Sequence, residues 1–292
     1  MCSLSIWQSM LSVIRENKIQ SNLCSTTENL ERCDGGLRRS GYFKQSLQDR
    51  PLITVITVVY NGYIHLEQTI QSVVNQTYSN IEYIIIDGGS TDVTLDIIHK
   101  YQNKIDYWIS EPDNGIADAM NKGLSFSTGD YILFMNADDY LINNDCLKNA
   151  VEQVNNSDII LFNILYGVNL KELSPRGFNF WMNFKTGVFH QAVLCHRNVF
   201  NMIGGFDTDF IIVLDYDFFL RAYRSGVTVH KNPSVLSVMR DTGISSRKDV
   251  KSVLQRFAEE RMVHKKNCLG IMMSWLYKVY WFLYIGYKKI TF

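Results

Sequence analysis

The sequence predicts an α/β fold built on a doubly wound, mostly parallel sheet, followed by C-terminal helices. Two observations support this prediction. From Pro51 onward, runs of β-branched and apolar residues alternate with amphipathic helical segments over about 90 residues. Each run also ends in a cluster of polar residues, and open α/β sheets bind their ligands beyond the carboxyl ends of the strands.

The first strand is expected at residues 52–60, LITVITVVY. Its unbroken run of apolar and β-branched residues is typical of a strand buried on both faces. Asn61 and Gly62 interrupt the run and predict a turn. Beyond them, residues 63–76 carry apolar side chains at helical spacing, so an amphipathic helix should follow the strand.

The next elements continue the same alternation. Residues 81–87, IEYIIID, predict a second buried strand, after which Gly88–Gly89 turns the chain. Ser90 or Thr91 is expected to cap a helix that runs to about Tyr101. The remaining elements of this half are a strand at 105–110, a short helix ended by glycine within 114–129, and a strand at 131–135.

Beyond residue 140 the pattern is less regular. We expect a helix at 145–154, a strand at 158–165, mixed structure at 166–190, a helix ended by glycine at 213–226, one or two strands at 227–239 and a charged helix at 248–266. The chain thus divides into an N-terminal extension (1–50), an α/β domain (51–247) and C-terminal helices (248–292). Within the extension, residues 35–45 should form a linker or an arm lying on the domain.

The composition excludes several classes of protein. Lys+Arg and Asp+Glu both number 29 in the 292 residues, so there is no basic excess of the kind that nucleic-acid binding needs. The 6 cysteines show no CxxC spacing, which argues against a zinc site and a disulfide framework and suits a reducing cytosol. The N-terminus lacks a basic leader and an unbroken apolar run, so no secretory signal is predicted.

Two adjacent carboxylates, Asp138 and Asp139, follow the strand at 131–135. They repel each other and lose hydration on burial unless a cation or several donors receive them. One explanation is a turn in which one Asp caps the helix near residue 145. The other is a site for Mg²⁺ or Mn²⁺, which takes one or two carboxylates and completes its shell with phosphate and water. Because adjacent side chains diverge, one Asp should hold the metal and the other should serve a neighbouring group.

Asp87, Asp215 and Asp217 are further candidates. Asp87 ends a strand beside two glycines, so it either forms an Asx turn or helix cap, or accepts a base N–H or ribose hydroxyl. Asp217 lies four residues before Arg221, which predicts an ordinary exposed ion pair of little energetic weight. Asp215 points elsewhere on the helix and either caps it or acts as a general base at the mouth of a cleft.

His190 and Gln191 are candidate acceptor contacts. They follow an apolar pair, and a single His is more often structural, so both explanations stay open. Neither GxGxxG nor GxxxxGK[ST] occurs, which disfavours a nicotinamide dinucleotide site and a phosphate-binding loop.

Taken together, these segments resemble a known family. TVITVVYNG, IEYIIIDGGSTD, SEPDNGIADAMNKG, GDYILFMNADD, HQAVLCHRNVF, GGFD and LDYDFFLR occur in the order expected of a bacterial family-two glycosyltransferase, over about residues 50–245. The sequence looks most like members that build O-antigen, capsule or exopolysaccharide. This resemblance implies the A-type glycosyltransferase fold, a nucleotide-sugar donor, a divalent metal (Mg²⁺ or Mn²⁺) and inversion at the anomeric carbon.

The resemblance also assigns roles to residues. Asp138 matches the metal-binding Asp of the family's DxD pattern, and Asn136 stands where its first Asp usually touches ribose. Asp215 matches the base of the family's ED pair, with Leu214 at the Glu position. The residues expected along a nucleotide-sugar donor, most simply a UDP-sugar, are Thr57, Tyr60, Asn61, Asp87, Asp113, Asn121, Lys122 and Asn136.

The implied reaction adds one sugar per encounter, because the QxxRW pattern of processive synthases is absent. In it, Asp215 takes the acceptor proton while the metal neutralises the leaving diphosphate. One alternative is a sugar nucleotidyltransferase, which needs a Gly-rich, Lys-bearing loop that VVYNGYIHLE does not offer. Another is a non-catalytic, membrane-associated scaffold of polysaccharide assembly, against which the presence of Asp138 and Asp215 argues.

Residues 269–292 are the most apolar and aromatic stretch of the chain. A membrane-spanning helix needs roughly 20 apolar residues, but Lys278 lies at the centre of this stretch. The segment could also pack into the protein's own core. We favour an interfacial helix, with Trp and Tyr at headgroup level and Lys278, Lys288 and Lys289 reaching anionic phosphates. The expected location is cytoplasmic and peripheral, on the inner face of the cell membrane, near a glycan or polyprenyl-diphosphate-linked acceptor.

Overall fold

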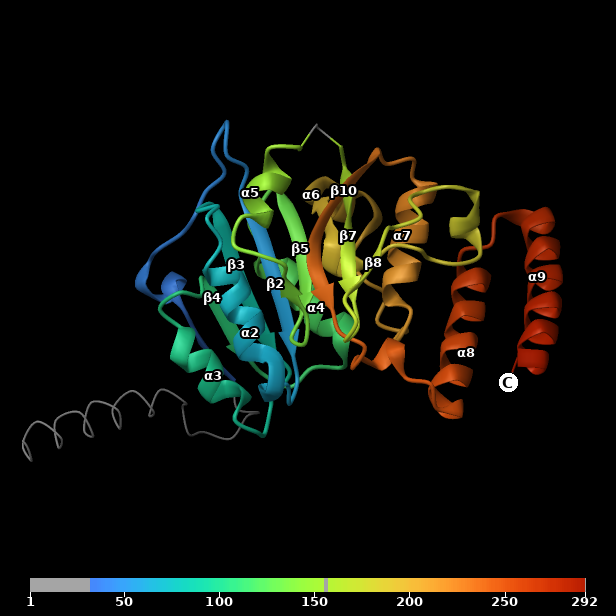
Figure 1. The fold of residues 1–292 in the computed structure, drawn as a ribbon, viewed down its shortest axis with the longest axis horizontal. Helices are drawn as coiled ribbons and strands as arrows, with labels where there is room; N and C mark the ends of the chain where they lie inside the picture. The colour runs from blue at the N-terminus through green and yellow to red at the C-terminus, as the bar shows by residue number, and fades with distance from the viewer. Residues whose placement is uncertain (1–31, 155–156, 292) are drawn as a thin grey trace, which may run out of the picture.

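The computed structural model describes residues 32–154 and 157–291. Figure 1 shows a central twisted sheet with helices on both faces and two further helices, α8 and α9, at one end. The expected N-terminal extension, residues 1–50, therefore lies partly outside the described residues.

Four parallel strands form the first half of the sheet. They are β2 (Ile53–Val59), β3 (Ile81–Asp87), β4 (Tyr107–Ser110) and β5 (Tyr131–Asn136), in the order β4-β3-β2-β5. Every residue of β2 and β3 is buried, as expected for strands covered on both faces. The predicted parallel arrangement is therefore confirmed.

The second half extends the same sheet with mixed pairing. Its strands are β6 (Tyr140–Leu141), β7 (Ile159–Tyr166), β8 (Lys171–Leu173), β9 (Val193–His196) and β10 (Val229–Met239). Strand β9 lies antiparallel between β5 and β7, whereas β10 runs parallel to β7. The antiparallel β9 was not among the strands expected from the sequence.

Helices cover both faces of this sheet. One face carries α2 (Tyr63–Val74), α3 (Thr94–Tyr101) and α5 (Cys146–Val151), and the other carries α4 (Ile116–Phe126), α6 (Arg197–Ile203) and α7 (Leu214–Arg224). Short 3-10 turns are η1 (Leu37–Ser40), η2 (Phe180–Asn183), η3 (His190–Ala192) and η4 (Ile244–Ser246). Along β2, Ile56 joins one core and Val55 the other, which is the alternation of a doubly wound sheet.

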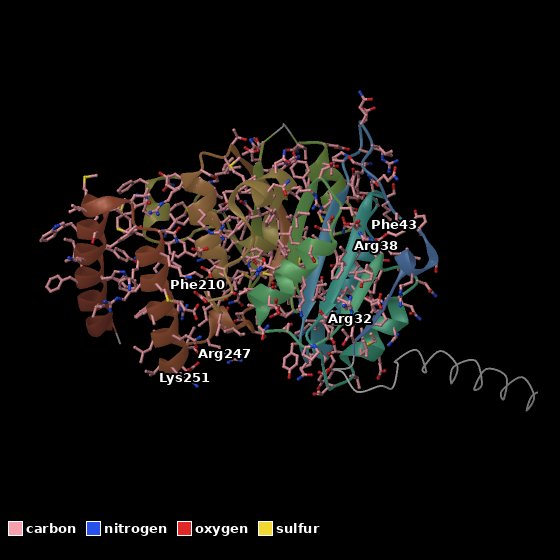
Figure 2. The ribbon with its side chains drawn as sticks, turned by 180° about the vertical axis from the view of Figure 1, so that it is seen from behind. Arg32, Arg38, Phe43, Phe210, Arg247 and Lys251 are labelled. Atoms are coloured by element: carbon pink, nitrogen blue, oxygen red, sulfur yellow. The ribbon has the colours of Figure 1, made fainter. Side chains whose placement is uncertain are left out.

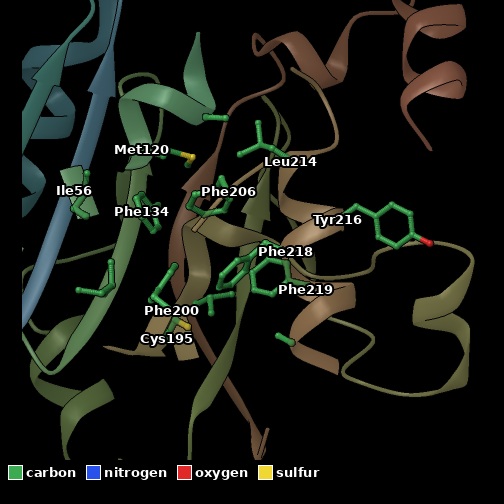
Figure 3. Packing of buried hydrophobic residues seen from close by; sticks show 14 of the residues in the cluster. Ile56, Met120, Phe134, Cys195, Phe200, Phe206, Leu214, Tyr216, Phe218 and Phe219 are labelled. Atoms are coloured by element: carbon green, nitrogen blue, oxygen red, sulfur yellow. The ribbon is translucent and has the colours of Figure 1, made fainter. Parts of the chain in front are cut away.

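Aromatic rings fill the core beneath α6 and α7. Phe134 of β5 meets Phe206 edge-on with ring centroids 5.1 Å apart, and Phe200 stacks on Phe218 at 4.9 Å (Figure 3). Such pairs add about 0.5–1.5 kcal/mol beyond the burial of their area. This cluster holds α7 on the sheet and thereby fixes the helix that carries Asp215.

Two details of the helices differ from expectation. Neither Ser90 nor Thr91 caps α3, because the backbone N–H of Thr94 donates to the carboxylate of Asp92 at 2.9 Å. Helix α4 does not end at a glycine either, and it continues through Gly123. A Cβ at that position would lie 2.4 Å from a methyl group of the β2 core, so glycine serves close helix–sheet packing there.

The segment before Pro51 is part of the domain rather than a free linker. Residues Cys33–Gly35 form β1, which pairs antiparallel with β4 at the edge of the sheet. The Arg38 guanidinium forms an ion pair with buried Glu82, and Nζ of Lys44 lies 2.9 Å from Asp106. Figure 2 shows Arg38 at this edge. Of the two expected alternatives, a linker or an arm, the contacts of residues 35–45 fit the arm, and the strand directly before them joins the sheet.

Helices α8 (Val250–Lys266) and α9 (Gly270–Thr291) pack side by side beyond α7 (Figure 1). His264 of α8 joins them: the indole of Trp281 donates to its Nδ1, and its Nε2 lies 2.9 Å from the hydroxyl of Tyr216 on α7. The ring also stacks on Tyr277 with centroids 4.2 Å apart. Burial lowers the pKa of His264 to about 4, so this packed imidazole is neutral at pH 7.

Helix α9 is apolar on both of its faces. Met273, Tyr277 and Trp281 are buried against α8 and against Phe184, which directly follows η2, as in a core helix. The opposite face exposes Ile271, Met272, Trp275, Val279, Phe282 and Leu283. Within the described residues, no helix is both long and apolar enough to span a membrane.

Candidate active site

The polar clusters predicted at the strand ends meet at one edge of the sheet. The register aligns Val59 with Asp87, Asp87 with Ser110, and Val58 with Asn136. Parallel strands of matching register end together, so the segments that follow β2, β3, β4 and β5 line a common edge. This is the edge at which the sequence predicted a ligand site.

Three residues from distant segments meet at this edge. Nδ1 of His190 in η3 lies 3.7 Å from Oδ2 of Asp215 in α7, and its Nε2 lies 3.4 Å from Oδ1 of Asn136 at the end of β5. All three side chains are only partly buried. The predicted base, one predicted acceptor contact and the first position of the DxD pattern are therefore neighbours in space.

Asp139 serves its neighbours, as expected for one of the two adjacent carboxylates. It is 1% exposed and accepts hydrogen bonds from the Gln191 amide and the Arg240 backbone N–H at 2.9 Å, and from the Asn136 amide at 3.3 Å. Burial, followed by the charge of Asp138, raises the pKa of Asp139 to about 7. The expected acceptor contact of Gln191 is not supported, because this side chain is also 1% exposed and holds Asp139.

Asp138 faces the open side of the same turn. Its Oδ2 accepts from the Thr242 hydroxyl at 2.7 Å, and its backbone carbonyl accepts from the Arg240 guanidinium. Its Oδ1 makes no hydrogen bond within the described chain. The described residues also contain no group of three or more His, Cys, Asp or Glu that could hold a metal. The available ligand is thus one carboxylate, which fits a Mg²⁺ or Mn²⁺ ion held mainly by substrate phosphates and water.

Two residues expected beside the donor are enclosed instead. Asp87 is fully buried and accepts from Ser90, through both its backbone N–H and its hydroxyl, and from the Ser110 hydroxyl at 2.6 Å. This arrangement corresponds to the structural alternative, in which Asp87 holds the turn that follows its strand. Thr57 lies within β2 rather than at its end, and its hydroxyl bonds the Tyr83 hydroxyl at 3.1 Å in the core. The structure therefore does not bring Thr57 to the site.

Asn121 and Lys122 on α4 also have protein partners. The Asn121 amide both accepts from the Phe206 N–H and donates to its carbonyl, each at 2.8 Å, so it connects α4 to the segment before α7. The Lys122 ammonium lies 3.2 Å from Glu111 and 3.6 Å from Asp118. Asn121 is therefore placed as a structural connection, whereas Lys122 lies in a partly exposed network of charges.

Tyr60, Asn61 and Asp113 remain accessible at the edge. Tyr60 is 63% exposed, and Asn61 adopts a left-handed backbone with φ of 49° while its side chain accepts from the Thr91 N–H. Asp113 accepts from the Gly115 N–H at 2.9 Å, and burial raises the pKa of its carboxyl. These side chains are therefore open to contact with a ligand at this edge of the sheet.

Glu259 of α8 is a buried carboxylate that sequence reasoning missed. Its Oε2 accepts from three successive backbone N–H groups, those of Ile211, Ile212 and Val213, at 3.1, 2.7 and 3.2 Å. These groups directly precede α7, so Glu259 fixes the turn that presents Asp215. The sequence carried one weak signal, because Glu259 shares a helix face with Val263.

Replacing Glu259 with Gln should lower both stability and turnover. The neutral amide keeps one oxygen acceptor but loses a charge-assisted interaction, so the free energy of unfolding should fall by about 1.5–3 kcal/mol. Displacement of Asp215 should lower kcat and leave the KM for the donor nearly unchanged. Glu260→Gln is the control, because Glu260 is also buried but pairs with Lys185 at 2.6 Å. Equal kcat losses in both variants would contradict this role of Glu259.

The fold and the polar groups at its strand ends are those of a transferase, and comparison with known proteins gives the family. The sequence model of glycosyl transferase family 2 matches residues 54–228, and the chain belongs to this family. A relative from Mycobacterium tuberculosis, described as an uncharacterized glycosyltransferase, is 31% identical over 232 residues, which is 75% of this chain and 87% of the relative. The protein is accordingly a glycosyltransferase.

Solved structures show the same A-type glycosyltransferase fold. Staphylococcus aureus TarS 1–349 in complex with UDP-GlcNAc has a TM-score of 0.56 at 19% identity, covering 73% of this chain and 70% of that one. The mannosyltransferase PcManGT from Pyrobaculum calidifontis, in complex with GDP-Man and Mn²⁺, has a TM-score of 0.55 at 22% identity, covering 72% and 64%. This chain thus spans less than two thirds of the second protein's length.

Proposed function

We propose that this glycosyltransferase transfers one sugar, with inversion, from a UDP-sugar to a glycan or lipid-linked acceptor in surface polysaccharide synthesis. The observation that carries the proposal is the contact of Asp215 with His190, and of His190 with Asn136, beside Asp138 at the carboxyl edge of the sheet. A carboxylate that can take a proton and a carboxylate with a free oxygen are the two protein groups that such a reaction needs.

Asp215 is the proposed general base. As the acceptor oxygen attacks the anomeric carbon, its proton passes to the Asp215 carboxylate and the bond from that carbon to the diphosphate oxygen breaks. Oδ1 of Asp215 accepts from the Tyr216 N–H at 2.7 Å, which fixes the carboxylate and directs Oδ2 toward His190. His190 is the proposed neighbour of the acceptor hydroxyl.

Asp138 is the proposed protein ligand of Mg²⁺ or Mn²⁺. The free Oδ1 of Asp138 supports this role, as does the Mn²⁺ in the PcManGT complex. The ion would supply charge neutralisation for the departing diphosphate. Asn136 in place of a second carboxylate leaves the protein with a single anionic ligand, which makes the ion dependent on the phosphates of the donor.

The donor is proposed to lie over Tyr60, Asn61, Asp113 and Lys122. The bound UDP-GlcNAc of TarS supports a UDP-sugar, although the PcManGT complex holds GDP-Man. For Asp87 to contact a base or ribose, the hydrogen bonds from the Ser90 and Ser110 hydroxyls to its carboxylate oxygens would have to break.

The test is release of nucleoside diphosphate from a panel of UDP-sugars and GDP-Man, with Mn²⁺, Mg²⁺ or EDTA. One UDP-sugar should release UDP slowly with water and faster with acceptor, and EDTA should abolish the release. A nucleotidyltransferase would need a sugar phosphate, and a scaffold would release nothing. If GDP is released from GDP-Man and no UDP is released from any UDP-sugar, the assignment of the donor as a UDP-sugar is wrong. The proposal of a sugar transfer reaction would not be affected.

We infer further that α9 seats the enzyme on the inner face of the cell membrane, next to a lipid-linked acceptor. Its outward face exposes a row of large apolar side chains, a surface that soluble monomers rarely leave uncovered. Phe180 and Trp181 of η2 are also more than half exposed, and both contact Phe184, which packs against Tyr280 of α9. Aromatic residues beside an apolar helix face are typical of an interfacial segment.

Flotation of the full chain with anionic vesicles tests whether α9 binds the membrane. The double variant Ile271→Ser/Phe282→Ser should shift the enzyme from the vesicle fraction to the soluble fraction, because both side chains are at least 80% exposed and lose apolar contact with lipid. The control variant is Val168→Ser/Leu170→Ser, which removes two exposed apolar side chains outside α9. It should leave flotation unchanged. Equal losses in the two variants would contradict a seat on α9.

A further inference from the structure

A cleft of about 420 Å³ lies along the contact between the C-terminal half of α8 and α9. Its walls carry three cationic side chains, Arg261, Lys265 and Lys278, and no carboxylate. Three like charges around one small space create a positive potential that favours the entry of an anion. The cleft is therefore complementary to an anionic group.

The three cations lack acidic partners within the described chain. Their neighbour Lys266 shows the contrast, since it lies 2.6 Å from both Asp207 and Asp209. The guanidinium of Arg261 instead lies 5.8 Å from the ring centre of Trp281, and the ammonium of Lys278 lies 5.5 Å from that of Trp275. Aromatic faces thus hold two of the cations in place while their hydrogen-bond donors stay available.

The cleft also opens onto the apolar side of α9. Phe282 and Ile285 line it, and Phe282 is 80% exposed, so the cleft continues into the outward apolar face of the helix. A ligand that satisfies both surfaces has an anionic head and an apolar body. Free phosphate or a nucleotide would leave the apolar half of this surface in water.

We propose that the cleft between α8 and α9 binds the phosphate headgroup of an anionic membrane lipid, whose acyl chains lie along the exposed face of α9. This inference rests on the membrane seat proposed above and adds a defined headgroup site to it. His264 forms part of the wall and hydrogen-bonds Tyr216, the neighbour of Asp215. A lipid bound here would therefore lie against the helix pair that supports the base, and would orient the active site relative to the membrane.

Two triple variants test the site, each removing one Arg and two Lys. The cleft triple is Arg261→Ala/Lys265→Ala/Lys278→Ala, and the control triple is Arg247→Ala/Lys248→Ala/Lys251→Ala. Figure 2 shows Arg247 and Lys251 at the other end of α8. Binding of the full chain is measured on phosphatidylcholine vesicles with and without phosphatidylglycerol. Each basic residue near an anionic surface contributes about fivefold to binding, so the cleft triple should lose on the order of 100-fold on the anionic vesicles.

The control triple should lose no more than about fivefold, the effect of a single basic residue. UDP release from the donor in solution and the melting temperature should match the parent in both triples, which shows that each variant is folded. Equal losses in the two triples would mean diffuse attraction and would overturn the headgroup site, while the apolar seat would stand. If the cleft triple binds anionic vesicles as tightly as the parent, the headgroup site is likewise wrong.

Soluble glycerol phosphate and inorganic phosphate distinguish the source of the phosphate. Neither should displace the enzyme from vesicles at millimolar concentration, because neither supplies the apolar body. Displacement by either would overturn the assignment to a lipid. Failure of the parent chain to bind any vesicle would overturn both the headgroup site and the membrane seat, but UDP release would still measure the transfer reaction.

Discussion

Asp215→Asn is expected to lower kcat by about 10²–10⁴-fold, the usual contribution of a positioned general base. The amide keeps the size of the side chain and can still accept the Tyr216 N–H at Oδ1, so the start of α7 should not move. UDP and donor affinity, measured by calorimetry, should stay at the parental level because Asp215 acts on the acceptor. A loss of less than tenfold would remove Asp215 from the role of base.

Asp217→Asn is the matched control, two residues along the same helix. The expectation of a weak, exposed pair with Arg221 was wrong, because Asp217 is 2% exposed and also accepts from the Asn267 amide at 2.8 Å. Its Oδ2 lies 2.8 Å from Nε of Arg221. Loss of the buried charge should reduce the free energy of unfolding by about 1–3 kcal/mol and leave kcat near parental. Equal kcat losses in both variants, with unchanged melting, would contradict this division of roles.

Asp138→Asn is expected to lower kcat by on the order of 10²-fold or more, the effect of removing one group that stabilises developing charge. Among the described residues, the adjacent carboxylate cannot replace it, because Asp139 is buried and accepts from Gln191 and Arg240. The rate should be measured over a range of Mn²⁺ and Mg²⁺ concentrations. The variant should need far more metal than the parent, or fail to saturate.

Asp139→Asn serves as the comparison for the metal. Its side chain supports the turn and does not face the open site, so the metal concentration at half-maximal rate should stay at the parental value. Near-parental turnover of Asp138→Asn in limiting metal would remove Asp138 as the ligand. If only Asp139→Asn changes the metal concentration at half-maximal rate, Asp139 and not Asp138 is the metal ligand.

The sequence by itself determined the parallel half of the sheet and the edge at which the site lies. The strands at 53–59, 81–87 and 131–136 follow from local runs of apolar and β-branched residues. Such runs favour a buried strand whatever the rest of the fold is. The sequence also indicated that Asp138 and Asp139 have separate tasks, because adjacent side chains diverge. The motif order pointed to the family that the comparison confirms.

Only the tertiary structure decided which groups meet. The antiparallel β9, the burial of Gln191 behind Asp139 and the three N–H donors around Glu259 all join segments far apart in the chain. Asp217 shows the same limit, since its spacing from Arg221 predicts the ion pair but neither its burial nor its contact with Asn267 at the end of α8. The tail carries large apolar side chains on two opposite faces, so local sequence could not tell a packed helix from an interfacial one. Contact with His264 buries one face, and the other stays exposed because no described segment reaches it.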